Sequence, residues 1–359
     1  MTNTFIFGSE SLTRAIEAIV AAGGSDAREA RLVAENLIAA NLTGHDSHGV
    51  GMIPRYIESL QEGGLQVNRH PVMKFDGGAL IALDGQAGYG QVIGMEATEM
   101  AIARARQHGV CVMALANSHH LCRIGQWAEN AVAQGFVSLS FVNVISRSIV
   151  APFGGTDARF GTNPVTIGIP LEGQPPFILD MATSGVAQGK VRVAHNKGER
   201  VAPGLLIDDH GQPTTEARFG VIEPFGALTT FGLHKGYGLA VVCELLGGAL
   251  TGGGTQHTDD RSKKRVLNGM LSILIDPQRL GTAPGFAREA AEFIAWVKKS
   301  PPAQGVDRVR IAGDPERETR AKRLAAGIAV DATSWNDILA AGAKLGLERG
   351  AIQRIAEGG

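Results

Sequence analysis

The segment GYGQVIG, Gly88 to Gly94, decides between two fold classes. It follows a predicted strand and begins a predicted helix, which is where a Rossmann fold carries its phosphate-binding glycines. Its spacing, however, is G-x-G-x-x-x-G rather than G-x-G-x-x-G. The next strand, VCVMAL (110–115), ends in Ala116-Asn117-Ser118 and offers no carboxylate for a ribose hydroxyl. We therefore interpret the segment as a glycine turn at a helix start and predict a non-Rossmann fold.

The predicted elements change in type on either side of this segment. Apolar stripes with helical spacing run through residues 1–65, and Asp76-Gly77-Gly78 marks a hairpin between two short strands. A helix is predicted from Gln91 to Gln107, a buried apolar helix at 236–250, and helical sequence again from about residue 286. Further strands are predicted at 136–142, 166–170, 176–180 and 270–276. We predict an α+β protein: a mixed, largely antiparallel sheet domain at 71–284 packed on a helical domain formed by 1–70 and 285–359.

Composition narrows the functional classes. The 359 residues are 44% hydrophobic, enough for a sizeable core, and 34 basic residues balance 35 acidic ones. This balance argues against nucleic acid or a membrane surface as a partner, and no apolar run is long enough to span a membrane. Three widely spaced cysteines, Cys111, Cys122 and Cys243, are typical of a reducing compartment, so we expect a soluble cytoplasmic protein.

Two histidine pairs are the candidate chemical groups. GHDSHGV, Gly44 to Val50, holds two histidines, an aspartate and a serine in four consecutive positions, and Tyr56 follows it. His119 and His120 form a second pair about seventy positions later. Histidine exchanges protons near neutral pH, so the pairs predict proton chemistry on a small polar substrate.

Other chemistries were weighed against this one. His45, His48, His119 and His120 could supply zinc ligands for a metal-dependent hydrolase or lyase, although adjacent histidines rarely face one ion and HExxH is missing. A serine hydrolase is disfavoured because Ser184 lacks the G-x-S-x-G elbow. A ligand-binding protein without catalysis is the third class.

Three glycine-rich segments are candidates for ligand contacts: 151–164, 180–190 and 234–239. The second places Asp180 and two hydroxyl residues at a strand end. The third begins the apolar helix at His234-Lys235, where free N–H groups favour an anion.

With these motifs in order, the chain resembles the type-2 malate/L-lactate dehydrogenase family. The resemblance rests on GHDSHGV with Tyr56, NSHH, VAPFGG with FGTNP, LDMATS, GQPTT, HKGYGLA and GDPE. It is similar above all to the hydroxycarboxylate dehydrogenase branch. The family implies a homodimeric oxidoreductase, without a Rossmann fold, that interconverts 2-oxo and 2-hydroxy acids using NAD or NADP.

The resemblance also implies residue roles. His120 matches the acid/base histidine, and His48 and Asp180 are further catalytic candidates, with Asp180 expected to orient His120. His48 and Tyr56 also line the substrate and nicotinamide end. Lys235 would meet a phosphate or the carboxamide end of the dinucleotide. The implied cofactor-binding residues are His48, Cys122, Arg123, Ile124, Ser148, Ile178, Leu179, Asp180, Met181, Ala182, His234, Lys235, Asn268, Gly313, Asp314, Pro315 and Glu316.

Two departures from the family pattern concern the substrate. Met52 stands where the family carries an arginine that holds the substrate carboxylate, and NSHHLC followed by Arg123 replaces the usual NSNHFG. Arg123 lies three residues after His120, a spacing that places both on one face of a helix. We predict that Arg123 replaces the lost anchor, binding either the substrate carboxylate or the adjacent pyrophosphate.

Overall fold

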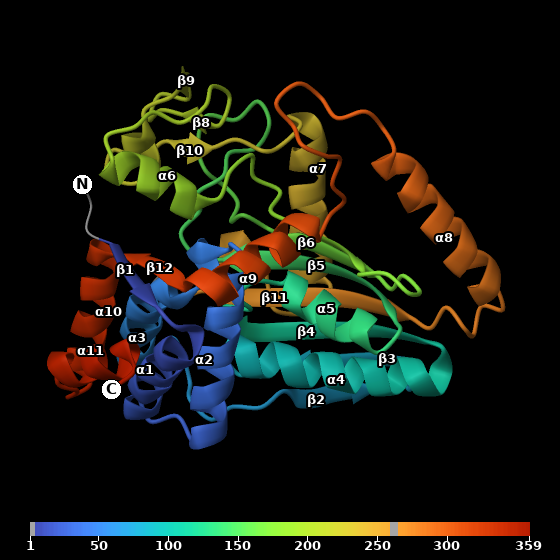
Figure 1. Ribbon diagram of the computed structural model, residues 1–359, viewed down its shortest axis with the longest axis horizontal. Coiled ribbons are helices and arrows are strands. Elements are labelled where there is room, and N and C mark those ends of the chain that lie inside the picture. The colour runs from blue at the N-terminus through green and yellow to red at the C-terminus, as the bar shows by residue number, and fades with distance from the viewer. Residues whose placement is uncertain (1–3, 259–264) are drawn as a thin grey trace.

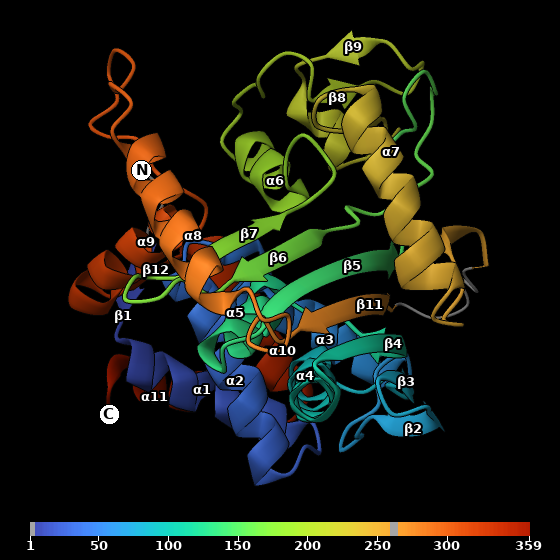
Figure 2. The ribbon, with the colours of Figure 1, turned by 90° about the vertical axis from the view of Figure 1, so that its right-hand side faces the viewer.

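A seven-stranded sheet forms the centre of the computed structural model, which describes residues 4–258 and 265–359. The strands follow the order β2-β3-β4-β11-β5-β6-β7 (Figures 1 and 2). Their bounds are β2 Val72–Asp76, β3 Leu80–Asp84, β4 Val110–His119, β5 Val137–Ile145, β6 Val165–Ile169, β7 Phe177–Met181 and β11 Leu267–Ile275. β3 and β4 run parallel, and every other neighbouring pair is antiparallel. The predicted α+β class with a mixed, largely antiparallel, non-Rossmann sheet is confirmed.

The GYGQVIG segment lies within the one parallel connection of this sheet. Strand β3 leads through the glycine turn into α4 (Gly90–His108) and back into β4, which forms a single β-α-β unit. This local unit explains why the sequence suggests a dinucleotide fold. The next strand beside β4 is β11, which is antiparallel and comes from much later in the chain, so the doubly wound pattern is not continued. The helix predicted from Gln91 to Gln107 is confirmed.

A helical lobe packs at one end of the sheet and contains both ends of the chain (Figure 1). Its fully buried side chains include Leu12, Ile16 and Leu37 from the N-terminal part and Trp335 and Ile338 from the C-terminal part. It contains β1 Thr4–Phe7, α1 Ser9–Ala22, α2 Ala27–Leu42, α3 Ile53–Gln61, β12 Ile328–Asp331, α10 Ala332–Lys344 and α11 Arg349–Glu357. Between α2 and α3 lie two short 3-10 turns, η1 (Asp46–His48) and η2 (Val50–Met52).

Two later helices have different surroundings. α9 (Asp314–Ala326) contacts α2, whereas α8 (Ala283–Lys298) lies apart from the helical lobe (Figure 1). Although α8 belongs to the segment 285–359 assigned above to the helical domain, only its Ala283 and Ile294 are buried. The proposed domain boundaries stay a prediction.

A small three-stranded sheet, β10-β8-β9, covers one side of the structure with α6 (Gln188–Asn196) and the short η3 turn (Ala217–Gly220) (Figure 2). The short strands are β8 Leu206–Ile207, β9 Pro213–Thr214 and β10 Ala227–Leu228, and α5 (Gly125–Ala133) covers the main sheet. The apolar helix predicted at 236–250 is present as α7 (His234–Val242) continued by a π-helical segment, η4 (Cys243–Ala249). Its predicted burial is wrong on one face, because Leu245 and Leu250 are exposed.

Within the described residues, no helix combines the length and the apolar character that crossing a bilayer requires.

Candidate active site

The GHDSHGV segment is held between the two ends of the chain. The Asn41 amide, on α2, donates to Asp46 Oδ1 at 2.7 Å, and its oxygen accepts from the Val50 N–H at 2.9 Å. From α9, Arg323 binds both Asp46 carboxylate oxygens, at 2.6 and 2.9 Å. His48 is therefore presented by a short loop that neighbouring helices fix on two sides.

His120 lies directly after β4 and is bonded to Tyr56 of α3. The Tyr56 hydroxyl is 2.8 Å from His120 Nδ1 and accepts a hydrogen bond from Gln91 Nε2 of α4 at 2.9 Å. The His48 ring stacks on the His120 ring, with centroids 5.5 Å apart. Because Nδ1 is occupied by Tyr56, Nε2 is the His120 nitrogen left for a substrate.

The glycines of GYGQVIG bring α4 against this histidine. A Cβ on Gly90 would lie 2.0 Å from the His120 carbonyl oxygen, and one on Gly94 would lie 2.6 Å from the Trp127 ring. Close backbone approach is a recognised reason for glycine. These glycines therefore allow α4 to pack against His120 and Trp127, in addition to forming the turn and helix start that the sequence predicts.

His119 points away from its neighbour and into the protein. It is completely buried, its ring meets the edge of Tyr56 at 5.6 Å, and neither ring nitrogen has a hydrogen-bond partner in the described part of the chain. His120 lies just beyond the end of β4 and is only partly buried. His120 is thus the member of the pair that can meet a substrate.

Burial controls the protonation of all three imidazoles. It lowers the pKa of His48 to about 4 and that of His119 to about 3, with nearby positive charge adding to the effect. The pKa of His120 is well below its usual value, mainly through burial and further through His48, His119 and Arg55. The imidazoles are therefore neutral at pH 7 in the free protein.

The four-histidine metal site is not supported. His45 faces Glu316 at 3.4 Å, His48 bonds Ser47 at 2.9 Å, and His119 is turned into the core. Within residues 4–258 and 265–359, no three His, Cys, Asp or Glu side chains are grouped so that they could hold a metal ion.

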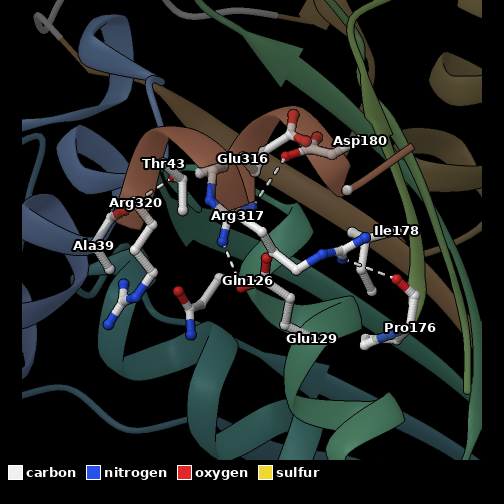
Figure 3. Close-up of a pocket in the computed structure, with 12 residues that line it drawn as sticks. Ala39, Thr43, Gln126, Glu129, Pro176, Ile178, Asp180, Glu316, Arg317 and Arg320 are labelled. Carbon is white, nitrogen blue, oxygen red and sulfur yellow. Dashed lines mark hydrogen bonds and ion pairs between the residues drawn. The ribbon is translucent and has the colours of Figure 1, made fainter. Parts of the chain in front are cut away.

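A pocket of about 390 Å³ lies between α2, α5, β7 and α9. Figure 3 shows Arg317, Arg320 and Glu316 of α9 above Gln126 and Glu129 of α5. The lining residues are Ala39, Thr43, Arg123, Gln126, Glu129, Pro176, Ile178, Asp180, Gly313, Glu316, Arg317 and Arg320. Five of them were predicted as cofactor contacts: Arg123, Ile178, Asp180, Gly313 and Glu316.

Arg123 and Asp180 belong to this pocket. The expectation that His120 and Arg123 share one face of a helix is wrong, because α5 begins only at Gly125. Arg123, 3% exposed, pairs with Glu129 at 2.5 Å, and its Nη1 lies 3.9 Å from Asp180. Burial opposes its charge, but Glu129 and Asp180 outweigh burial and raise the pKa of Arg123. Asp180 accepts a hydrogen bond from the Gly125 N–H at 3.0 Å and so caps α5. The expected contact between Asp180 and His120 is not formed in the described structure.

The other predicted cofactor residues are divided between this pocket, the sheet and the far end of the molecule. Cys122 donates to the His48 carbonyl at 2.9 Å, and Ile124 is buried in the core. Asn268 is engaged with the Leu121 N–H and the Asn143 carbonyl, so its side chain joins strands instead of facing a ligand. Further residues are placed as follows: Ser148 after β5, Leu179, Met181 and Ala182 along or after β7, Asp314 paired with Lys298 and Arg317, exposed Pro315, and exposed His234 and Lys235 at the start of α7.

The sequence interpretation missed three residues of this region. Gln91 lies inside the glycine segment, is buried, and donates a hydrogen bond that orients the Tyr56 hydroxyl. In the sequence it stands out only as a polar residue at a helix start. Arg55 lies one residue before Tyr56 and electrostatically affects both His119 and His120. Arg320 contributes an exposed cation to the pocket from a helix that looks merely charged in sequence.

Comparison with known proteins gives one consistent family. Residues 7–339 match the family model described as malate/L-lactate dehydrogenase. The chain is 45% identical over 353 residues to hydroxycarboxylate dehydrogenase B of Escherichia coli K12, covering 98% of this chain and 97% of that protein. It is 41% identical over 292 residues to an L-lactate dehydrogenase of Cupriavidus necator, covering 81% and 84%. A solved structure of a proposed malate/lactate dehydrogenase from E. coli superposes with a TM-score of 0.93 at 44% identity, covering 98% of each chain.

Proposed function

The chain belongs to the malate/L-lactate dehydrogenase family. On this premise we propose that His120 exchanges a proton with the substrate oxygen when the enzyme interconverts 2-oxo acids and 2-hydroxy acids. It is an oxidoreductase, as its relatives are. The observation that carries the proposal is the Tyr56–His120 hydrogen bond, which leaves one imidazole nitrogen free beside His48.

The cofactor we propose is NAD or NADP, and the pocket chemistry fits part of such a molecule. Arg123 Nε and Nη1 and Glu316 Oε2 are buried without a hydrogen-bond partner among the described residues. A guanidinium suits a phosphate oxygen and a carboxylate suits a ribose hydroxyl. Arg123, Ile178, Asp180, Gly313 and Glu316 would hold the dinucleotide. When bound, it supplies the hydride for C2 of the substrate.

His120 handles the proton from Nε2. In the reductive direction it donates to the carbonyl oxygen, and in the oxidative direction it accepts from the hydroxyl, a role worth about 10²–10⁴-fold in rate. Its lowered pKa keeps the imidazole of the free protein unprotonated, which is the form that accepts a proton in the oxidative direction. A bound carboxylate places negative charge nearby and raises the pKa, which favours the protonated donor when a 2-oxo acid is present.

The test is an absorbance assay at the reduced-nicotinamide band with a panel of 2-oxo acids and both cofactors. We expect turnover with at least one pair, and a loss of at least about 10²-fold in His120→Asn with reduced-cofactor binding retained. No turnover by the parent with any pair would refute the function. Turnover of His120→Asn within threefold of the parent would refute the role of His120.

We also propose that the chain forms a homodimer. Its accessible surface is 16,599 Å², whereas a monomer of 37.6 kDa is expected to expose about 13,800 Å². Large apolar side chains are exposed on α8, with Phe293 at 56% and Trp296 at 71%, and also at Leu245 and Leu250 of the α7–η4 helix. A second copy that covers these side chains would remove the surplus. Sedimentation equilibrium should give twice the chain mass, and a monomer at micromolar concentration would refute the proposal.

The proposed location is the cytoplasm. All three cysteines are free thiols and buried, which suits a reducing compartment. Fractionation of the producing cells with compartment markers tests this.

A further inference from the structure

The position that carries the carboxylate-binding arginine in the resembled family is used for packing in this chain. Met52 is partly buried and packs against the core of the helical lobe. A thioether has no charge and no N–H to offer a carboxylate. A 2-oxo acid still needs a fixed cation near His120, so another residue must provide it.

Arg123 is poorly placed for this task. Its guanidinium is bonded to Glu129 and lies near Asp180, inside the pocket between α5 and α9. Two carboxylates already compensate this one charge. A small substrate carboxylate would have to compete with both of them. The unpartnered Nε and Nη1 can still donate to an oxygen of a larger ligand that other residues of the pocket also hold.

Arg55 has the opposite surroundings. It directly precedes Tyr56, the residue that binds His120 Nδ1, and its side chain is exposed. It forms no ion pair in the described part of the structure, and its charge reaches both imidazoles, contributing to their lowered pKa values. Arg55 keeps contact with solvent while neighbouring protein displaces enough water to lower its own pKa. Glu58, one turn further along α3, is the only carboxylate that acts on this charge among the described residues, so the cation favours an incoming anion.

Two further arginines increase the positive charge around Arg55. Helix α6 packs on the η1 turn so closely that a Cβ on Gly189 would be 2.8 Å from Ser47 Cβ. Arg192 follows Gly189 by three residues, on the same side of α6. Arg147, after β5, stacks its guanidinium on the Phe225 ring at 3.8 Å. Both act on Arg55 as like charges, and neither forms an ion pair among the described residues.

We infer that Arg55, supported by Arg192 and Arg147, is the anchor that binds the carboxylate of the 2-oxo acid beside His120. The inference rests on the proposed function and replaces the expectation that Arg123 holds the substrate. An arginine fork binds both carboxylate oxygens at once, which fixes the orientation of the carbonyl as well as its position. Arg55 is thus a substrate-binding residue and Arg123 a cofactor-binding one.

The experiment compares Arg55→Met, Arg55→Lys and Arg123→Met with the parent and with Arg14→Met, which removes an exposed arginine of α1. Steady-state kinetics are measured on the best 2-oxo acid, and reduced-cofactor binding is titrated by fluorescence. A third readout is calorimetric binding of oxamate, a carboxylate that cannot be reduced, to the protein with reduced cofactor. Circular dichroism confirms that each variant is folded.

For Arg55→Met we expect a KM and an oxamate Kd raised about 10- to 100-fold, with unchanged cofactor binding and a smaller effect on kcat. Arg55→Lys should recover part of the lost affinity for substrate and oxamate, because lysine keeps the positive charge but lacks the planar guanidinium that binds two oxygens at once. Arg123→Met should weaken binding of the reduced cofactor and leave the Kd of oxamate unchanged. A KM and oxamate Kd within twofold of the parent in Arg55→Met would overturn the inference while leaving the reaction standing. A parent that neither turns over 2-oxo acids nor binds oxamate would overturn both.

Discussion

The pH dependence of the free energy of unfolding tests whether His119 is buried, as the structure places it. The ring is completely buried without a hydrogen-bond partner in the described structure, and burial lowers its pKa to about 3 from an ordinary value of 6.5. Below pH 6.5 the unfolded chain takes up a proton at His119, while the folded chain does not until near pH 3. The stability that this histidine contributes is therefore complete above pH 6.5 and is lost as the pH falls toward 3.

The size of the effect follows from the two pKa values. Between pH 7 and pH 5 the unfolded state gains about 1.9 kcal/mol from protonation of one ordinary histidine, at 1.36 kcal/mol per unit. The folded state gains almost nothing over the same range, because pH 5 is still far above its pKa. His119→Asn removes the titrating group. The variant should therefore lose about 1.9 kcal/mol less free energy of unfolding than the parent between pH 7 and pH 5.

The assay is urea unfolding of the parent and of His119→Asn at both pH values, at one protein concentration. The quantity compared is the difference between the two pH values within each protein, so any constant cost of the substitution cancels. His210→Asn, which removes a solvent-exposed histidine, serves as the control and should behave as the parent does. An identical pH dependence in parent and His119→Asn would show that His119 is hydrated or charged in the folded state, and the placement of the pair would be wrong.

Four further results are expected. Tyr56→Phe removes the bond to His120 Nδ1, and kcat should fall about tenfold or more in steady-state kinetics, with KM little changed. Gly90→Ala would place a Cβ 2.0 Å from the His120 carbonyl, so it should lower both the melting temperature and kcat, although alanine normally favours a helix. Arg123→Met should raise the Kd of the reduced cofactor about tenfold or more in a fluorescence titration. Asp180→Ala removes the carboxylate that caps α5 and faces Arg123, and thermal melts should show a loss of about 1 kcal/mol.

The parts of this protein that can be predicted from sequence depend on local patterns. The glycine spacing of GYGQVIG and the missing carboxylate after VCVMAL exclude a Rossmann site by local chemistry alone. The predicted bounds of α4, Gln91 to Gln107, agree with the structure within one residue at each end. The choice of His120 over His119 comes from the family resemblance, and it stays a prediction that suits the complete burial of His119 and the Tyr56–His120 hydrogen bond.

The parts that escape prediction depend on distant contacts. Asp180 looks like a catalytic partner of His120 in sequence, yet it accepts a hydrogen bond from Gly125, fifty-five positions earlier. The local pattern IPRYIES identifies the buried Tyr56 face of α3 but does not reveal that the charge of Arg55 lowers the pKa values of His119 and His120. Likewise, the apolar sequence of 236–250 predicts a helix correctly. Whether each of its leucines is buried, however, depends on which distant segments pack against that face of the helix.

The place of β11 in the sheet has a consequence for the order in which the protein can be made. Leu267–Ile275 lies between β4 and β5, two strands that the ribosome completes more than a hundred residues earlier. Until β11 emerges, the facing edges of β4 and β5 have no partner strand between them, and unpaired edges invite association with other chains. The last strand to reach the main sheet is thus a central one. Nascent chains shorter than about 275 residues should therefore depend on chaperones that shield strand edges. The insertion of β11 should be the slowest step in folding.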